Sequence, residues 1–233
     1  MQLGMFRLPS LAVNLPGRTR EPCSIAARLC FGVTVAPAIE RATQRFVDTN
    51  GVTLRVTEAG EHNGPSAPVI LLAHGFPELA FSWRHQIPAL ADAGFHVLAP
   101  DQRGYGGSSR PDEIAAYDIA SLTGDLVGLL DDVGAQSAIW IGHDWGGPVV
   151  WSAAQLHPDR VAGVVGLSVP PVPRPQAPPT EAFRKLFGEN FFYMLYFQEP
   201  GVADAELDAD PARTMRRMMG SLSPADRESA LLM

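Results

Sequence analysis

The sequence predicts an α/β fold in which helices cover both faces of a mostly parallel β-sheet. Short apolar runs recur along the chain, and such runs are typical of strands that are buried on both faces. Between them lie segments whose apolar residues are three and four positions apart, as on one face of a helix. Because strands and helices alternate in this way, each strand is expected to reach its parallel neighbour through a helix.

The predicted sheet begins with a β-hairpin. Residues Gln44 to Val47 and Val52 to Thr57 indicate two strands around Asn50-Gly51, a dipeptide that accepts the positive φ angles of a tight turn. The next strand, Pro68 to Ala73, is a nearly unbroken apolar run that ends in the sequence HGFPE at residues 74–78. Loops that follow buried strands often carry function, so this loop is a candidate site.

Helices and strands are then expected to alternate. The predicted segments are a helix over Ser82 to Ala93, a strand over His96 to Ala99, a helix over Ile119 to Val133, a strand over Ser137 to Ile141, a helix over Val149 to Leu156 and a further buried strand over Val161 to Val169.

Proline and charge divide the chain into four parts. Residues 171–179 are rich in proline, which propagates neither a helix nor a central strand, so they are expected to form a linker. We expect residues 41–170 to be the N-terminal part of the core and residues 180–233 to be the start of a helical lid. Residues 1–40 are basic and poor in acidic residues, and we interpret them as a disordered extension, with a targeting segment as the alternative.

The composition argues against several classes of partner. The 233 residues carry a formal net charge of −7, which would not attract nucleic acid or an anionic membrane surface. No window reaches the ~18 uninterrupted apolar residues of a membrane-spanning helix. Both cysteines, Cys23 and Cys30, lie in the first 40 residues, so no disulfide framework or Cys-based zinc site is expected in the body. A cytoplasmic location is the simpler interpretation.

The sequence GHDWGG, residues 142–147, has the layout of a nucleophile elbow between a strand and a helix, with Asp144 in the nucleophile position. The glycines would let two backbones cross closely at a strained turn. A serine that opened an epoxide would form an ether, which water does not easily cleave, whereas a carboxylate forms an ester that water can hydrolyse. Asp144 therefore suits attack on a saturated carbon, and it needs no base to ionise it at neutral pH.

Two other interpretations of GHDWGG are open at this point. Glycines after a strand can serve helix–sheet packing or phosphate binding, and an aspartate there can cap the following helix through its side chain. Because short glycine motifs recur often, the choice depends on the rest of the sequence.

Four segments in a fixed order resemble soluble-type epoxide hydrolases of the α/β-hydrolase superfamily, with a particular likeness to bacterial, mycobacterial-type members. They are HGFPE at 74–78, DQRGYGGS at 101–108, GHDWGG at 142–147 and YFQEPG at 196–201. The resemblance extends from Arg41 to Met233 and is far more specific than the elbow alone. It implies an α/β-hydrolase fold with the start of a helical lid, in which the C-terminal part of the core is missing.

The resemblance also implies a mechanism. Asp144 would attack an epoxide carbon to form an alkyl-enzyme ester that is later hydrolysed to a diol. Tyr193 would protonate the departing oxygen, since a phenol is still protonated at neutral pH. Tyr196, three residues later on the same helical face, competes for that role. The backbone N–H groups of Phe76 and Trp145 would form the oxyanion hole.

The remaining motif residues are expected to be structural. They are His74, Gly75, Pro77, Glu78, Gly142, His143, Gly146 and Gly147. None of the other histidines matches the base that activates water in this family; these are His62, His85, His96 and His157.

In the family the base histidine, its acid partner and a second lid tyrosine follow the lid, and here they are expected beyond Met233. The helical pattern from Asp226 to Met233 has no stop signal, so we expect a chain that is cut short within the lid. The expected consequences are a deficiency in turnover, with alkylation of the protein as the furthest step, and doubtful folding because sheet strands are missing.

No cofactor or metal is predicted. The expected partners are a small apolar epoxide and water, without nucleic acid or membrane, and with a homodimer as one option for assembly. A haloalkane dehalogenase-like hydrolase is the alternative enzyme, although such enzymes resembling this sequence typically have asparagine where Phe76 stands. A non-catalytic fragment that only binds a ligand is the alternative outside enzymes.

Overall fold

The computed structural model describes residues 42–173 and 176–219. The chain divides into two units, Met1–Pro37 and Ala38–Met233, and every described residue belongs to the second. The predictions for residues 1–40, including both cysteines, and for Asp226 to Met233 lie outside the described residues.

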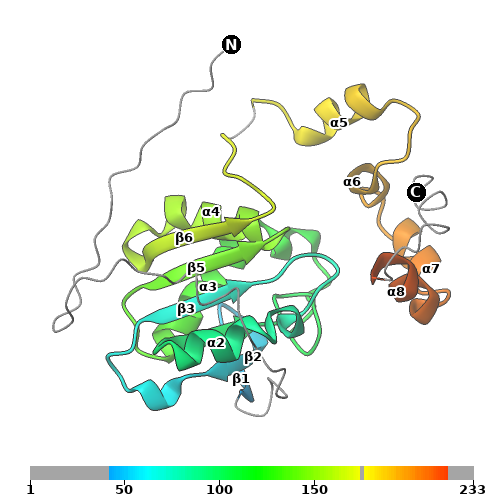
Figure 1. Ribbon diagram of the computed structural model, residues 1–233. Helices are drawn as coiled ribbons and strands as arrows, with labels where there is room; N and C mark the ends of the chain where they lie inside the picture. The colour runs from blue at the N-terminus through cyan, green and yellow to red at the C-terminus, as the bar shows by residue number, and fades with distance from the viewer. Residues whose placement is uncertain (1–41, 174–175, 220–233) are drawn as a thin grey trace, which may run out of the picture. The chain divides into compact units, whose positions relative to one another are not determined.

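The described residues form one six-stranded sheet with the strand order β1-β2-β4-β3-β5-β6 (Figure 1). The strands are β1 (Thr43–Thr49), β2 (Val52–Ala59), β3 (Val69–Ala73), β4 (His96–Pro100), β5 (Ala138–His143) and β6 (Val161–Leu167). β1 and β2 form an antiparallel hairpin and β2 is antiparallel to β4, whereas β4, β3, β5 and β6 run parallel. The predicted α/β class with a mostly parallel sheet is confirmed.

Helices cover both faces of this sheet. α2 (Gln86–Asp92) packs on one face, and α3 (Ile119–Asp132) and α4 (Gly146–Leu156) pack on the other. The described residues after β6 form four further helices, which we call the lid segment: α5 (Pro179–Phe187), α6 (Tyr193–Tyr196), α7 (Val202–Leu207) and α8 (Pro211–Met219). Short 3-10 helices occupy Glu61–Asn63, Ala80–Trp83, Ile114–Tyr117 and Pro158–Arg160.

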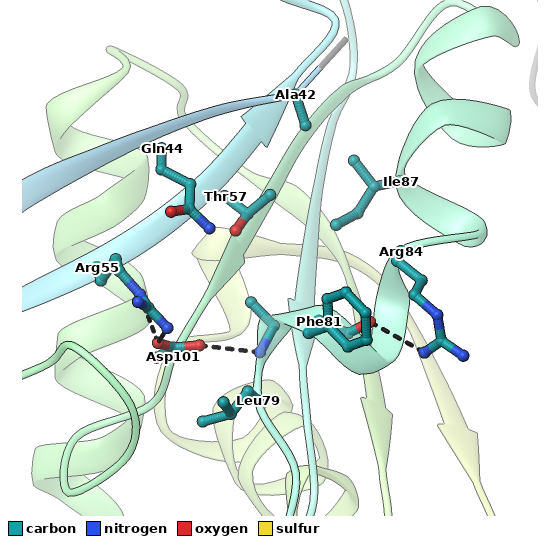
Figure 2. A pocket seen from close by; sticks show the side chains of 10 residues that line it. Ala42, Gln44, Arg55, Thr57, Leu79, Phe81, Arg84, Ile87 and Asp101 are labelled. Carbon is teal, nitrogen blue, oxygen red and sulfur yellow. Dashed lines mark hydrogen bonds and ion pairs between the residues drawn. The ribbon is translucent and has the colours of Figure 1, made fainter. Parts of the chain in front are cut away.

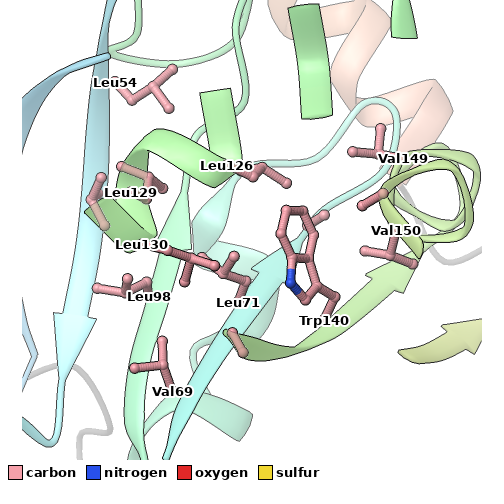
Figure 3. Close-up of a cluster of buried hydrophobic side chains, with 14 of the residues drawn as sticks. Leu54, Val69, Leu71, Leu98, Leu126, Leu129, Leu130, Trp140, Val149 and Val150 are labelled. Atoms are coloured by element: carbon pink, nitrogen blue, oxygen red, sulfur yellow. The ribbon is translucent and has the colours of Figure 1, made fainter. Parts of the chain in front are cut away.

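The larger core cluster lies between the sheet and α3 and α4 (Figure 3). Trp140 of β5, Leu71 of β3 and Leu98 of β4 are fully buried there against Leu129 and Leu130 of α3. Burial of each such leucine contributes about 1.5–3 kcal/mol, so this cluster holds α3 onto the parallel strands. Parallel strands that are apolar on both faces explain why the sequence shows unbroken apolar runs here.

The hairpin turn has the predicted geometry. Asn50 has a φ of 45° and Gly51 a φ of 77°, both in the left-handed region that a two-residue hairpin turn requires.

Two predictions about elements are wrong. The helix over Ser82 to Ala93 is instead a 3-10 turn at Ala80–Trp83 followed by α2, which begins at Gln86. Pro88 in the first turn of α2 explains the break, because its ring clashes with the carbonyl four residues earlier in a continuing helix.

The strand over Val161 to Val169 is shorter than predicted and is not buried. β6 ends at Leu167, and Val165 and Leu167 are 44% and 42% exposed. In the described part of the chain β6 is one of the two edge strands of the sheet, with β1 at the other edge, so only one neighbouring strand pairs with it.

The strand order places the functional loops together. β3 lies between β4 and β5. The chain runs from β3 to β4 on one side and then crosses to β5 on the other side, so the strand order reverses at β3. Ligands bind at such switch points in open α/β sheets. Ala73 pairs with Gly142, so the HGFPE loop and the elbow emerge side by side. The DQRGYGGS loop leaves β4 on the other side of β3.

Candidate active site

Asp144 lies between the end of β5 and the start of α4. Its φ is 49°, an unusual value for a residue with a side chain, and such strained residues cluster at functional sites. Its N–H donates to the carbonyl of Leu167 at 3.2 Å, and its own carbonyl accepts the N–H of Gly147 at 2.9 Å. These bonds on both sides hold the strained turn in place.

The helix-cap interpretation of Asp144 is wrong. The N-cap position of α4 is Trp145, and no side chain caps this helix. The Asp144 carboxylate is directed instead at the neighbouring loop, where the backbone N–H of Phe76 donates to Oδ1 at 3.0 Å.

Three motif glycines are required because neighbouring chain segments lie too close to leave room for a side chain. A Cβ atom on Gly146 would lie 2.1 Å from the carbonyl oxygen of Ala73, and one on Gly142 would lie 2.2 Å from that of Gly146. A Cβ on Gly75 would lie 2.5 Å from the Cβ of Asp144 itself. Any side chain at these positions would therefore push β3, the HGFPE loop and the elbow apart. Gly147 is less constrained, since its Cβ would meet Val169 at 3.1 Å.

Phe76 and Trp145 carry the two backbone N–H groups that the sequence predicts for the oxyanion hole. That of Phe76 already contacts Oδ1 of Asp144, and that of Trp145, at the N-terminal end of α4, has no hydrogen-bond acceptor among the described residues. The indole of Trp145 is 43% exposed. An unused N–H beside a carboxylate is available for an oxygen that becomes negatively charged during a reaction.

Glu78 ties the HGFPE loop to the elbow. Its Oε2 accepts the backbone N–H of Gly75 at 3.1 Å and lies 3.1 Å from Nδ1 of His143. The peptide between Phe76 and Pro77, inside the same loop, is cis. Glu78 and His143 therefore hold together the two loops that carry Phe76 and Asp144.

His74 is fully buried and structural. Its Nδ1 lies 2.8 Å from the carbonyl of Gly75, and its Nε2 accepts the N–H of Gln102 at 3.0 Å. Burial lowers the pKa of His74, although the bond to Gly75 acts in the opposite direction. With both ring nitrogens occupied, this imidazole links the loop after β3 to the loop after β4.

The two lid tyrosines face different surroundings. The pKa of Tyr193 is raised by burial and by the Asp144 carboxylate, while a hydrogen bond with the Trp145 side chain lowers it. Tyr196 donates from its hydroxyl to Oε2 of Glu206 at 2.6 Å, within the lid segment. The structure therefore brings Tyr193, and not Tyr196, into the electrostatic environment of Asp144.

Phe197 joins the lid segment to the core. Its ring centroid lies 5.5 Å from that of Phe76 and 5.9 Å from that of Tyr193, both in edge-on arrangements. Such aromatic pairs contribute about 0.5–1.5 kcal/mol each beyond the burial of their area. The contact places α6 against the residue whose N–H holds the Asp144 carboxylate.

Sequence reasoning missed Tyr105. Its ring packs edge-on against His74 at 4.9 Å, and burial together with the Asp144 carboxylate raises its pKa to about 12. The signal was an aromatic residue between glycines in a loop after a parallel strand.

Sequence reasoning also missed that Asp101 links the segments after β3 and β4. It is 1% exposed; its Oδ1 accepts the N–H of Ala80 at 3.0 Å and its Oδ2 is bound by Arg55 at 2.5 Å and by Gly107. It therefore braces the loops after β3 and β4, and the invariably ionised guanidinium beside it explains how a buried carboxylate is tolerated.

Among the described residues, the four remaining histidines do not hydrogen-bond to Asp144. His96 is bonded to Glu58 at 2.5 Å and His157 to Thr123 at 3.1 Å, while His62 lies in the first 3-10 helix and His85 directly before α2. None of the six makes a hydrogen bond with Asp144 in the described structure.

Across 42–173 and 176–219, no three His, Cys, Asp or Glu side chains are grouped so that they could hold a metal ion. No helix in the same ranges has the length and apolar character needed to cross a bilayer.

Comparisons with known proteins give a consistent result. Residues 68–218 match the family model for the alpha/beta hydrolase fold. The chain is 73% identical over 190 residues to Epoxide hydrolase A of Mycobacterium tuberculosis, covering 82% of this chain and 58% of that protein. It is 48% identical over 167 residues to Bifunctional epoxide hydrolase 2 of Rattus norvegicus, covering 71% of this chain and 29% of that protein.

A solved structure supports the same relationship. The crystal structure of Epoxide Hydrolase A from Mycobacterium thermoresistibile has a TM-score of 0.76 and 68% sequence identity, covering 82% of this chain and 59% of that one. The present chain thus spans a little under three fifths of the length of these two mycobacterial proteins.

Proposed function

Because this chain belongs to the α/β-hydrolase fold family and is homologous to epoxide hydrolases, we propose that Asp144 is the nucleophile of an epoxide-opening site. The observation that carries the proposal is the Asp144 side chain itself, held at a positive φ with Oδ1 bonded to the Phe76 N–H. Its Oδ2 makes no hydrogen bond to another described residue, so this oxygen is free to attack.

In the first step Oδ2 attacks one carbon of the epoxide and the C–O bond of the ring breaks. The departing oxygen takes the phenolic proton of Tyr193, whose raised pKa keeps the phenol protonated at neutral pH. The product is an ester between Asp144 and the opened substrate, with Oδ1 as the ester carbonyl.

In the second step water attacks the ester carbonyl carbon. The charge that develops on Oδ1 is stabilised by the Phe76 N–H, which already contacts this atom, and by the unused N–H of Trp145. Collapse of the intermediate releases a diol and restores the Asp144 carboxylate. This step needs a general base to accept a proton from water.

We further propose that the 233-residue chain by itself stops at the ester. All six of its histidines lie in described ranges; His74 has both ring nitrogens bonded, and His143 is paired with Glu78. The proposed substrate class is a small apolar epoxide, because Phe76, Trp145 and Phe197 contribute aromatic surface beside Asp144.

Intact mass spectrometry after incubation with styrene oxide tests the proposal. We expect one epoxide added per chain, located on Asp144 by peptide mapping, and no more than one equivalent of diol.

Asp144→Asn is a suitable variant because asparagine tolerates a positive φ. This variant should show neither adduct nor diol, whereas the exposed Asp112→Asn should behave as the parent. An adduct that still forms on Asp144→Asn would contradict the proposal that Asp144 is the nucleophile. Many equivalents of diol per parent chain would contradict only the proposal that the reaction stops at the ester.

Tyr193→Phe tests the acid. Loss of the proton donor should slow ester formation by about 10²-fold, while Tyr196→Phe should leave the rate within about twofold. Equal rates in Tyr193→Phe and the parent would contradict the role. Release of chloride from 1-chlorobutane, faster than consumption of styrene oxide, would favour a dehalogenase-like activity instead.

A further inference from the structure

A cavity lies away from Asp144, between the β1–β2 hairpin and the segment that leads into α2 (Figure 2). Its volume is about 250 Å³, and Asp144, Phe76 and Tyr193 do not line it. Because a water molecule occupies about 30 Å³ in the liquid, the cavity can accept a small organic molecule.

One side of the cavity is polar and has unused hydrogen-bonding groups. Thr57 is only 8% exposed, yet its hydroxyl has no partner among the described residues, and neither has the amide of Gln44. Figure 2 shows these two side chains next to each other, above the Arg55–Asp101 pair in this view. Arg55 binds Asp101 through Nε at 2.7 Å and Nη2 at 2.5 Å, which leaves its Nη1 without a partner in the described structure.

The opposite side of the cavity is apolar and has a positive rim. Phe81, Ile87 and Leu79 form this wall, and the Arg84 guanidinium lies 4.7 Å from the centroid of the Phe81 ring. Asp101 does not make the cavity acidic, because its carboxylate is already satisfied by Arg55, Ala80 and Gly107. Two guanidinium groups against one carboxylate leave a net positive charge.

We propose that this cavity binds a small amphipathic carboxylate. The carboxylate accepts hydrogen bonds from Nη1 of Arg55, the Gln44 amide and the Thr57 hydroxyl, and the alkyl chain lies along Phe81 and Ile87. Arginine and neutral donors together suit a carboxylate, since charge-assisted bonds are stronger than neutral ones. A few convergent polar groups opposite an apolar wall are the usual makeup of small-molecule sites.

Binding would also affect the segments after β3 and β4 through Asp101. Arg55 holds this carboxylate, which in turn fixes Ala80 directly after the HGFPE loop and Gly107 in the DQRGYGGS loop. A bound acid on Arg55 therefore stiffens both loops and raises the unfolding temperature, because a ligand that binds only the folded state stabilises it.

Isothermal titration of the 233-residue chain with hexanoate tests the proposal, with hexanamide as the uncharged probe. We expect hexanoate to bind and hexanamide to bind at least about tenfold more weakly. Gln44→Glu places a negative charge at the carboxylate subsite and should weaken hexanoate binding by about tenfold or more. Thr57→Val removes one donor and should weaken it about threefold to tenfold.

Two controls locate the site. Gln136→Glu makes the same change of charge on an exposed residue that does not line the cavity, and it should bind hexanoate as the parent does. Asp144→Asn should also bind hexanoate unchanged. Circular dichroism without ligand verifies that each variant is folded. Equal binding of the two probes, equal effects of Gln44→Glu and Gln136→Glu, or binding that changes only in Asp144→Asn would overturn the proposal.

Discussion

At the scale of single residues, the site is built from side chains whose surroundings give them different properties. Asp144 accepts a strained backbone that costs on the order of 1–3 kcal/mol, and the Phe76 N–H and the Gly147 N–H hold it there. The Asp144 carboxylate contributes to the raised pKa of both Tyr193 and Tyr105, whereas the Tyr196 hydroxyl is bonded to Glu206. The neighbouring carboxylate thus distinguishes tyrosines that look alike in the sequence.

Tyr105 provides a test of this electrostatic environment. Its pKa of about 12 should make it the last of the four tyrosines to ionise. In Asp144→Asn a neighbouring negative charge is lost, so the phenolate is less disfavoured and the pKa of Tyr105 should fall, but it should stay above its ordinary value because burial, the larger cause, is unchanged. NMR titration of the tyrosine Cζ resonances, assigned with Tyr105→Phe, measures both values. An unchanged Tyr105 pKa in Asp144→Asn would show that the carboxylate does not act on this phenol.

At the scale of elements, Glu58 joins three strands at the start of the sheet. This residue of β2 is buried and contacts Arg45 of β1 and His96 of β4, and Arg45 also reaches Asp132 at the end of α3. Burial alone would raise the pKa of Glu58, but the hydrogen bonds from His96 and Arg45 outweigh it and hold the pKa below its ordinary value of 4.5. The ionised form is thus part of the folded hairpin.

The sign of the pH dependence follows from that shift. Because the pKa of Glu58 is lower in the folded chain than in the unfolded one, its contribution to stability is present above about pH 4.5 and is lost as the pH falls through the folded value. Glu58→Gln should cost about 1.5–3 kcal/mol of unfolding free energy at pH 7 and less near pH 3. Urea unfolding at both pH values measures this, with the exposed Glu181→Gln as control; a loss that is larger at pH 3 would contradict the argument.

The α6 segment of the lid is positioned by Phe197, which contacts both Phe76 and Tyr193. On the proposed function, Phe197→Ala removes the ring contacts with Phe76, Tyr193 and Tyr196 and loosens Tyr193 relative to Asp144, so alkylation by styrene oxide should slow about tenfold. Phe187→Ala is the matched control, since Phe187 stacks on Phe192 within the lid segment. Stopped incubation followed by intact mass gives both rates. If the two variants are slowed equally, the contact with Phe76 has no special role.

At the scale of the whole molecule, the sheet combines a well-covered centre with an exposed edge. β3 and β4 are buried on both faces, whereas β6 is an edge strand of the described sheet, as β1 is at the other side. One face of β6 packs on α4, where a Cβ on Gly166 would lie 2.5 Å from the Trp151 ring. Val165 and Leu167 alternate with Gly166 and therefore point to the opposite, exposed face.

An exposed apolar edge strand is a site of edge-to-edge pairing, and natural sheets protect such edges with charge. We expect the 233-residue chain to self-associate at high concentration and Val165→Lys to reduce that association. Sedimentation velocity across a range of concentrations measures the effect. Ile114→Lys adds the same charge at a residue that is 76% exposed in a 3-10 helix, and it should change the association less. Equal effects of the two lysines would point to net charge rather than to the β6 edge.

Local patterns carried most of the element prediction. Unbroken apolar runs identified β3, β4 and β5, and Asn50-Gly51 identified the hairpin turn. The apolar spacing alone did not show that α2 begins at Gln86, although Pro88 in its first turn was a local signal of a helix start. The pattern could not show that β6 is an edge strand, because burial depends on strand order.

Part of the candidate site could be predicted from the sequence and part could not. The elbow glycines and Asp144 could be read from GHDWGG, since a chain reversal so tight permits few residue types. The Glu78–His143 pair, the place of Tyr105 and the cavity beside Arg55 could not, because each joins residues from separate loops.

The sequence by itself determined the α/β class, the order of strands and helices and the aspartate at the turn, because periodicity and glycine placement act over a few neighbouring residues. Only the tertiary structure decided which N–H holds Asp144, which lid tyrosine senses it and which strand is left at the edge. Those outcomes depend on contacts between residues far apart in the chain, such as Phe76 with Asp144, and these form only when the strands take their places in the sheet.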